Sequence, residues 1–267
     1  MIDGVPYQLK APFDFTFMQK FGKVFKVFDE QESGNICFGV EKNSRRHFVK
    51  FAGAPTVSYP GKPEDAVSRL RDSVPVYKDL AHPHLIRLLD AEEIGNGFAV
   101  VFEWVDAVCM GKQYPDEREK FMRLPIEKKL QAYWDIMEFH AHVAAKKYVA
   151  IDFYDASIMY GFENAKTVVC DVDFYQKAPY YGDMGLWGST RFVSPEERTN
   201  GALLDEVTNV YTMGATAFAL FSNSDRSREA WPLSAELFAV VAKAVNPERG
   251  GRQQSIRRLM EEWRAAK

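Results

Sequence analysis

The stretch that decides the fold runs from Tyr148 to Tyr175 and reads YVAIDFYDASIMYGFENAKTVVCDVDFY. An apolar run at 148–151 ends at an aspartate, and β-prone runs follow at 158–160 and 167–170. The six residues between these two runs are turn formers, so we expect an antiparallel hairpin. The carboxylates before its first strand and after its second should then gather at its open end. They are Asp152, Asp155, Asp171 and Asp173.

Four carboxylates at one place repel each other, and such a cluster needs either a cation or shifted pKa values. Ligands that are all oxygen suit Mg²⁺, which usually binds one or two carboxylates together with substrate phosphates. The alternative is that each aspartate is a solvated turn residue. That interpretation is the better one for a single aspartate, whereas four at one hairpin mouth favour a cation site.

This stretch resembles the catalytic loop and the magnesium loop of protein kinases. Asp152 stands at the aspartate of the H-R-D motif, and Asp171 at the aspartate of D-F-G. The match has departures from the family pattern. Ala150 and Ile151 replace His and Arg, Ser157 occupies the position of the second metal-binding Asn, and Asp171-Val172-Asp173 replaces D-F-G.

Composition narrows the function classes. The chain has 267 residues, of which 46% are hydrophobic and 14% aromatic, enough to build a sizeable core. The net charge of −3 predicts no bulk attraction to nucleic acid or to an anionic membrane. Three widely spaced cysteines suggest neither a disulfide framework nor a zinc site. We find no apolar run of membrane-spanning length and no signal peptide, so we expect a cytoplasmic protein.

The first hundred residues resemble a kinase N-lobe. Strands are expected at 23–28, 36–40 and 47–51, in meander order. Lys50 in the third strand is similar to the lysine of V-A-I-K, although a strand lysine taken alone is usually just solvated. For the phosphate-binding loop we choose Gly34, with Ile36 following it as a nucleotide contact, and because only one glycine is present we expect a loose lid.

A helix is expected at 63–80, with Pro63 in its first turn and Pro75 breaking or kinking it near Ser73. Ser73 stands where kinases carry the glutamate that holds the lysine, so the partner of Lys50 is left open. We interpret His82 and His84 as turn-packing residues rather than as metal ligands. Strands at 85–89 and 98–105 follow, and the second resembles a kinase hinge. The resemblance implies that the backbone of Glu103 and Val105 meets the adenine edge.

An amphipathic helix at 126–147 leads into Asp152, and we interpret His140 and His142 as packing or solvent-facing residues. The most specific motif is Gly188–Glu196, GSTRFVSPE, which resembles the end of the kinase activation segment, G-T-x-x-Y-x-A-P-E. The helix expected at 205–221 resembles helix F, with Asn209 in place of Asp. The resemblance further implies an ion pair between Arg252 and Glu196.

Together these motifs predict an α+β, bilobal, protein-kinase-like fold. Residues 1–105 would form an N-lobe with a small antiparallel sheet and a helix, and residues 106–267 a mainly helical C-lobe. The family resemblance implies transfer of the γ-phosphate of ATP, with Mg²⁺, to a hydroxyl of a protein or small molecule. Asp152 and Lys50 would be catalytic. The nucleotide would contact Gly34, Ile36, Lys50, Glu103 and Val105, and the metal Asp171, Asp173 and Ser157.

Two alternatives stay open. The departures at Ser73, Ala150, Ile151 and Ser157 favour a pseudokinase that regulates a partner. The Asp171-Val172-Asp173 sequence is similar to the metal loop of small-molecule kinases of the aminoglycoside or choline type, and little chain is left after residue 221 for macromolecular docking. The Gly188–Glu196 motif argues against that second alternative, because in protein kinases it builds a peptide platform. The substrate and the oligomeric state are not encoded in any motif that we find.

Overall fold

The computed structural model describes residues 1–111, 114–182 and 188–267. The chain divides into two compact units. Unit 1 comprises Met1–Ala81 and Ile86–Val105, and unit 2 comprises His82–Leu85 and Asp106–Lys267. The change after Val105 falls where the sequence suggests it, but His82–Leu85 belong to unit 2. This short segment is bound there by its backbone, since the Val169 amide donates a 2.7 Å hydrogen bond to the His84 carbonyl.

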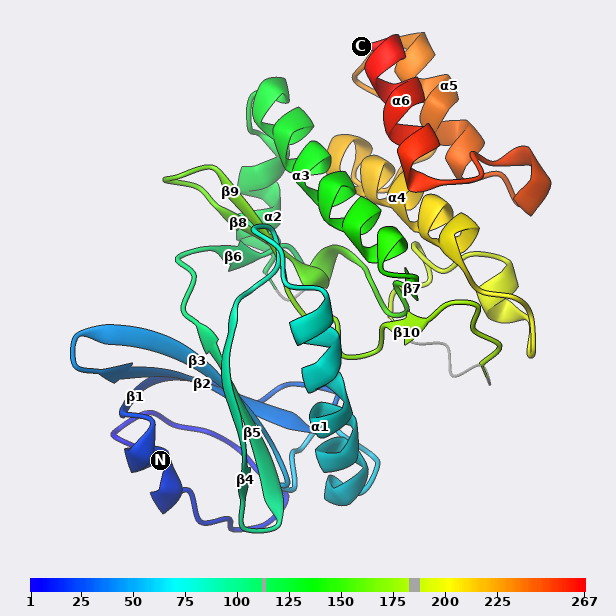
Figure 1. Cartoon of the computed structure of the whole chain (residues 1–267). Helices are drawn as coiled ribbons and strands as arrows, with labels where there is room; N and C mark the ends of the chain where they lie inside the picture. Colours follow the sequence, from blue (N-terminus) through cyan, green and yellow to red (C-terminus); the bar gives the residue numbers. More distant parts are fainter. Residues whose placement is uncertain (112–113, 183–187) are drawn as a thin grey trace. The chain divides into compact units, whose positions relative to one another are not determined.

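Unit 1 is built on a five-stranded antiparallel sheet with the order β1-β2-β3-β5-β4 (Figure 1). The strands are β1 (Lys23–Phe28), β2 (Asn35–Lys42), β3 (Arg45–Ala52), β4 (Leu88–Ile94) and β5 (Gly97–Glu103). The predicted meander of the first three strands is confirmed. The fourth was wrongly placed at 85–89, because its ladder with β5 runs from Leu88 opposite Phe102 to Ile94 opposite Gly97.

One face of this sheet is covered by the N-terminal residues. Phe15 and Met18, the latter in the 3-10 helix η1 (Thr16–Lys20), pack on Ile36 of β2 and Phe51 of β3 in a single buried cluster. Side chains of a strand alternate between its two faces. The neighbours Cys37 and Lys50, which are paired across β2 and β3, therefore project from the opposite face.

Helix α1 (Pro63–Asp79) follows the first three strands. Pro63 lies in the first turn, as predicted. The helix does not break near Ser73 but continues through Pro75 for four more residues, close to the expected end at residue 80. A proline inside a helix costs about 3 kcal/mol, and here burial of the flanking Val74 and Tyr77 offsets that cost. Tertiary packing, which a local proline rule does not include, decides the helix length.

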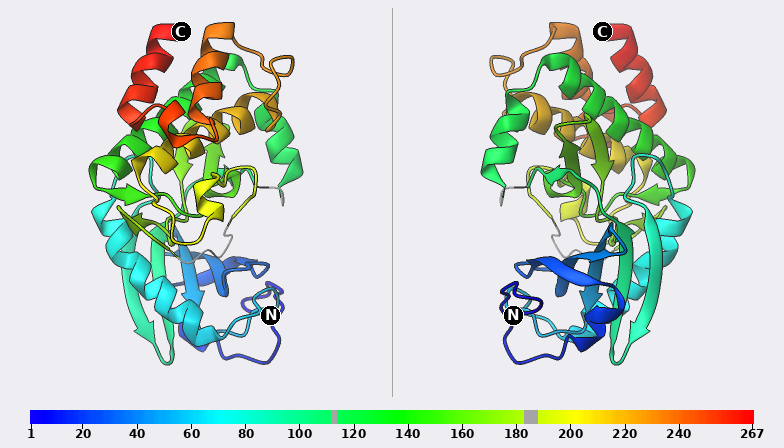
Figure 2. Two further views of the ribbon diagram at one scale, coloured as in Figure 1. Left: turned by 90° about the vertical axis from the view of Figure 1, so that its right-hand side faces the viewer. Right: turned by 90° about the vertical axis from the view of Figure 1, so that its left-hand side faces the viewer.

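Unit 2 is mainly helical (Figure 1). Its helices are α2 (Pro115–Met122), α3 (Ile126–Ala145), α4 (Glu206–Ser222), α5 (Ala235–Ala244) and α6 (Ile256–Ala266), with the 3-10 helices η2 (Asp155–Ser157), η3 (Glu196–Arg198) and η4 (Arg249–Gly251). Helix α4 is central, because it is buried from Thr208 to Ser222 and contacts α3, α5 and α6. Figure 2 shows the course of the chain through these helices from two sides. Asp205 caps it through a capping box with Thr208.

Two small β structures complete unit 2. Strand β7 (Tyr148–Val149) pairs with β10 (Gln176–Lys177), and a second sheet has the order β6 (Val108–Cys109), β8 (Ile158–Gly161) and β9 (Lys166–Val169). The predicted hairpin is present as β8 and β9, with Ile158 opposite Val169. Within the described ranges, no helix is both long and apolar enough to cross a membrane.

Candidate functional site

The backbone that leads to Asp152 is held by Asn209, a fully buried residue of the central helix α4. Its side-chain amide donates to the Tyr148 carbonyl at 2.9 Å, and its oxygen accepts from the Ala150 amide at 2.8 Å. Both ends of the buried amide are therefore satisfied, which is what makes its burial tolerable. Sequence reasoning placed Asn209 on this helix but did not predict that it ties the Asp152 segment to the centre of unit 2.

Two of the predicted site aspartates have a left-handed backbone, with φ of 64° at Asp152 and 61° at Asp171. Residues other than glycine rarely adopt this conformation, and each instance costs about 1–3 kcal/mol. Such strain persists only where the surrounding structure imposes it, and it concentrates at functional sites. That both aspartates carry it is an observation independent of the motif match.

The hairpin register brings Ser157 close to the second of these aspartates. The Cys170 amide donates to the Ser157 carbonyl at 2.9 Å, directly before Asp171. Asp171 itself is exposed, whereas Ser157 and Asp173 are buried. The open end of the hairpin thus presents one solvent-facing carboxylate, backed by a buried hydroxyl and a buried carboxylate.

The pKa of Tyr154 is shifted by the neighbouring aspartates. Burial raises the pKa of its phenol, and the negative charges of Asp152, Asp171 and Asp155 raise it further. Asp152, Asp155 and Asp171 therefore act on one phenol, which keeps its proton beside them, whereas Asp173, the fourth aspartate expected at this place, is not among the charges that act on Tyr154. This neutral phenol was not foreseen as a neighbour of the carboxylates.

Asp155 is the exception in this cluster, because its charge is already neutralised by the protein. It is 1% exposed and accepts hydrogen bonds from Arg118 of α2 and from Arg191, the latter at 2.8 and 3.0 Å. The same arginines bind Asn223 and Ser224 at the end of α4. The expectation that all four aspartates require a cation or shifted pKa values is therefore wrong for Asp155, which fastens α2 and the 188–196 segment to α4.

Gly188 lies directly against Asp152. Its φ is +78°, and a Cβ at this position would lie 2.5 Å from the Asp152 Oδ1. A side chain here would push the carboxylate aside, so the motif needs glycine for space as well as for backbone conformation. The first residue of the Gly188–Glu196 motif therefore limits where the Asp152 carboxylate can be.

The loops that carry Asp152 and Asp171 rest on one buried histidine of α3. The ring of His140 lies 4.4 Å from that of Phe153, and its Nε2 lies 3.1 Å from the Tyr175 hydroxyl. Its Nδ1 donates to the Ile136 carbonyl at 2.9 Å, so Nε2 accepts from Tyr175. Burial lowers the pKa of His140 to about 4 and keeps the ring neutral. The predicted packing role is confirmed, with two loops as its partners.

The end of the 188–196 segment is fixed by the predicted ion pair. Arg252 donates to both oxygens of Glu196 at 2.7 and 2.8 Å, and its side chain is fully buried. Burial is the largest single effect and raises the pKa of Glu196, but the hydrogen bonds and charge of Arg252, together with a backbone amide and the Thr208 hydroxyl, outweigh it and lower the pKa. A second arginine, Arg249, bridges Glu196 and Asp205 at 2.9 and 2.7 Å. Only the first of these two arginines was predicted.

The remaining predicted residues belong to unit 1. Lys50 is buried on β3 between Cys37 of β2 and Val100 of β5. Ile36 pairs with Phe51 and lies in the core under the N-terminal residues. Because adjacent strand positions alternate, Ile36 and Lys50 project from opposite faces of the sheet. The prediction that both contact one nucleotide is therefore wrong.

Gly34 has a packing role of its own. With φ of +81°, a Cβ there would lie 2.6 Å from the Tyr59 ring and 2.9 Å from Ala66 of α1. Arg69 of α1 also donates to the neighbouring Ser33 carbonyl. The loop before β2 is thus packed on α1. The expectation of a loose phosphate lid rests on the shortage of glycines and does not include these side-chain contacts, which hold the loop in place.

The residues that resemble a kinase hinge lie at the C-terminal end of unit 1. The Glu103 amide donates to the Arg87 carbonyl at 3.0 Å, so it is already engaged, and the Glu103 side chain pairs with Arg87. Val105 is the last residue of the unit. Ser73, at the position of the missing glutamate, uses its hydroxyl within its own helix by donating to the Leu70 carbonyl.

Aromatic rings crowd the sheet face that carries Lys50. Phe48 and Lys50 are two residues apart on β3 and share that face, and Phe48 pairs with Gly39. A Cβ on Gly39 would lie 2.7 Å from the Phe25 ring and 2.9 Å from the Trp104 ring. In the V-A-I-K motif the position of Phe48 is alanine. The aromatic rings therefore leave less free space beside Lys50 on this face of the sheet than the V-A-I-K motif alone implies.

No model of a known protein family matches this chain, and no curated protein sequence is detectably similar to it.

Proposed function

We propose that the protein is a Mg²⁺-dependent phosphotransferase of protein-kinase-like architecture, which transfers the γ-phosphate of ATP to a hydroxyl group. The observation that carries the proposal is the pair of left-handed aspartates, Asp152 and Asp171, at one hairpin mouth. The order of strands, helices and motifs along the chain also supports it. So does the buried Glu196–Arg252 pair, which the family resemblance implies.

The donor set at the hairpin mouth fits magnesium. Asp171 is an exposed carboxylate, and Mg²⁺ retains several of its waters, so a solvent-facing ligand suits it. Asp173 and Ser157 would supply further oxygens, the hydroxyl being the weaker ligand. When bound, the metal would neutralise phosphate charge. Lys50 would hold the α- and β-phosphates, as the resemblance implies.

The protein's own contribution would be to position the acceptor. Asp152 would orient the acceptor hydroxyl and take its proton, which requires an approach of about 2.6–3.2 Å. Asn209 fixes the backbone before Asp152, and Gly188 restricts its side chain. Tyr154, neutral beside the carboxylates, adds no competing charge. In this class of reaction most of the catalysis is positioning and charge neutralisation.

A second candidate is a pseudokinase, and one observation favours it. Phe48 stands in place of alanine, and the rings of Phe25 and Trp104 lie over Gly39 on the face that carries Lys50. These side chains compete for the space that an adenine would need. A regulatory scaffold with weak nucleotide affinity would tolerate them.

The proposal is tested by measuring MgATP binding and phosphotransfer separately. Calorimetry should show that Asp171→Asn weakens Mg²⁺-dependent ATP binding, whereas Asp116→Asn, an exposed aspartate on α2, leaves it unchanged. Labelled ATP with protein and small hydroxyl acceptors should show slow transfer, below the roughly 1–100 s⁻¹ of typical kinases. Asp152→Asn should abolish transfer but retain nucleotide binding. Binding without transfer in the wild type would leave the pseudokinase as the function.

A further inference from the structure

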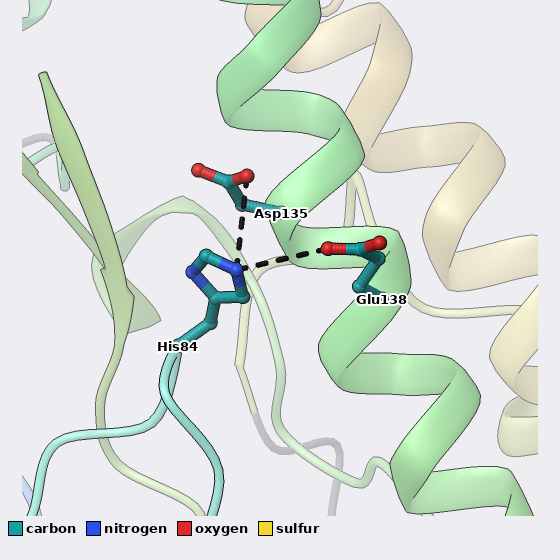
Figure 3. Close-up of side chains that lie close together, drawn as sticks. All are labelled: His84, Asp135 and Glu138. Carbon is teal, nitrogen blue, oxygen red and sulfur yellow. Dashed lines mark ion pairs between the residues drawn. The ribbon is translucent and has the colours of Figure 1, made fainter.

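A histidine and two carboxylates of unit 2 converge at a place that the proposed phosphotransfer does not use. His84 lies in the short segment before β4, and Asp135 and Glu138 lie on α3 (Figure 3). The two acidic residues are three positions apart, so they occupy neighbouring places on one helix face. Their ligand atoms and the His84 ring nitrogen all lie within 4.8 Å of one another.

The hydrogen bond on the other side of the His84 ring fixes which nitrogen faces the carboxylates. Nδ1 lies 3.3 Å from the Thr167 carbonyl, and a carbonyl can only accept, so Nδ1 carries a proton. In the neutral ring, Nε2 then presents its lone pair to Asp135 and Glu138. This is the arrangement of metal-binding histidines, which donate their second N–H to a backbone carbonyl or a carboxylate.

The distances distinguish a shared cation from a direct contact. Nε2 lies 3.7 Å from Asp135 Oδ1 and 3.8 Å from Glu138 Oε2. Both separations exceed about 3.6 Å, a distance at which a side-chain contact is no longer a hydrogen bond. Tetrahedral zinc with bonds of about 2.0–2.2 Å holds its ligand atoms roughly 3.4 Å apart. Small side-chain adjustments would therefore bring all three atoms into a coordination sphere.

We propose that His84, Asp135 and Glu138 form a binding site for a divalent transition-metal ion of the zinc type. An imidazole ligand disfavours Mg²⁺ and Ca²⁺, which prefer oxygen alone. Asp135 is additionally positioned by Gln131, whose amide donates to its Oδ1 at 2.7 Å. The exposed Glu138 leaves an approach from solvent, and three protein ligands leave a coordination position for water. This proposal departs from the expectation that His84 packs in a turn and does not bind a metal.

The metal would fasten α3 to the segment His82–Leu85 and to β9. The His84 carbonyl accepts from Val169, and its ring donates to Thr167, both in β9. Strand β9 ends two residues before Asp171. Metal binding should therefore stabilise unit 2 and the strand that leads to the candidate site, whether or not the protein is a phosphotransferase.

The test is zinc titration of the full chain after treatment with chelator. Calorimetry should show saturable binding of one Zn²⁺ per chain and a raised melting temperature. Cobalt should give the visible absorption of a four-coordinate ion. Glu138→Gln, a half-exposed position that leaves the core intact, should weaken zinc binding by at least about tenfold. The matched control is Glu127→Gln, an exposed residue of the same helix, which should bind zinc as the wild type does.

Three outcomes would overturn the proposal. The first is no saturable zinc binding by the wild type. The second is equal zinc affinity in Glu138→Gln and Glu127→Gln. The third is a melting temperature that zinc does not change, which would leave the cluster as a contact between the histidine and the two carboxylates alone. His84→Ala provides a second ligand variant, and Glu138→Gln keeps the test valid if His84→Ala does not fold.

Discussion

Arg252 donates two parallel hydrogen bonds, at 2.7 and 2.8 Å, to the carboxylate of Glu196, and both side chains are shielded from solvent. The guanidinium also binds the carbonyls of Asn246 and Pro247 and lies 4.9 Å from the ring centre of Tyr211. This pair joins η3, at the end of the 188–196 segment, to the turn before α6. Its bidentate geometry is the strong form of an Arg–carboxylate contact.

Arg252→Ala should strongly destabilise unit 2. Removing one partner of a buried ion pair costs about 3–5 kcal/mol, and Arg249, which contacts only one oxygen of Glu196, replaces only part of the lost interaction. For a domain of this size that corresponds to a fall in melting temperature of roughly 6–20 °C. Arg258→Ala on α6 is the control, since that arginine is exposed and its ion pairs contribute little. If the two variants melt at the same temperature, the Glu196–Arg252 contact contributes no more to stability than a surface ion pair does.

Gly188→Ala should impair the candidate site more than the fold. The added methyl group would meet the Asp152 carboxylate at 2.5 Å, and displacing a catalytic group by about 1 Å can cost about a hundredfold in rate. Gly201→Ala is a matched control, because Gly201 has a similar φ of +70° but nothing within 4 Å of a Cβ. Both variants carry the same backbone strain, so their melting temperatures should agree while phosphotransfer falls in Gly188→Ala alone. Equal transfer rates would remove Asp152 from the reaction.

The sequence predicted those parts of the fold that follow from local patterns. The hairpin between Ile158 and Val169 follows from two β-prone runs and the turn between them, and helix α4 follows from an apolar run. The Glu196–Arg252 pair is what the family resemblance implies. Ile36 was assigned wrongly because spacing from Gly34 does not give strand register, and a shift of one residue reverses the face. Of the break or kink expected from Pro75, the break does not occur, and the local rule that suggested it omits the burial of Val74 and Tyr77.

The contacts that the sequence did not predict join distant segments without a repeating pattern. Arg118 lies 37 positions from Asp155, in a run of charged residues typical of an exposed helix, and nothing in that run indicates a buried partner. His84 and Asp135 are likewise far apart in sequence, and they meet only because β9 holds the His84 backbone. Burial and tertiary contact create these sites, so they become visible only when the chain is folded.

His140 should make the protein less stable in mild acid. Its pKa is lowered to about 4 by burial, against about 6.5 in the unfolded chain. The unfolded state therefore binds a proton first, so the stabilising effect is complete above about pH 6.5 and is lost as pH falls toward 4. The loss amounts to about 3 kcal/mol. Urea unfolding between pH 7 and pH 4 measures it.

The comparison for that titration is His140→Phe, which keeps a ring next to Phe153 but cannot take up a proton. It should be less stable than the wild type at pH 7, because the Tyr175 hydroxyl loses its acceptor. Its stability should nevertheless decline less between pH 7 and pH 4. Parallel pH profiles for the two proteins would mean that other groups cause the acid sensitivity.

Phe48→Ala should reveal whether the aromatic rings on the Lys50 face restrict nucleotide binding. The substitution restores the alanine of the V-A-I-K motif and removes a ring from the face that also carries Phe25 and Trp104. We expect tighter MgATP binding by calorimetry, because an adenine no longer competes with the ring for space. Phe13→Ala is the control, since Phe13 packs on the opposite face against the core that contains Phe51. Weaker binding in Phe48→Ala alone would mean that the ring stacks on the base, so that the crowding of this face would no longer favour the pseudokinase.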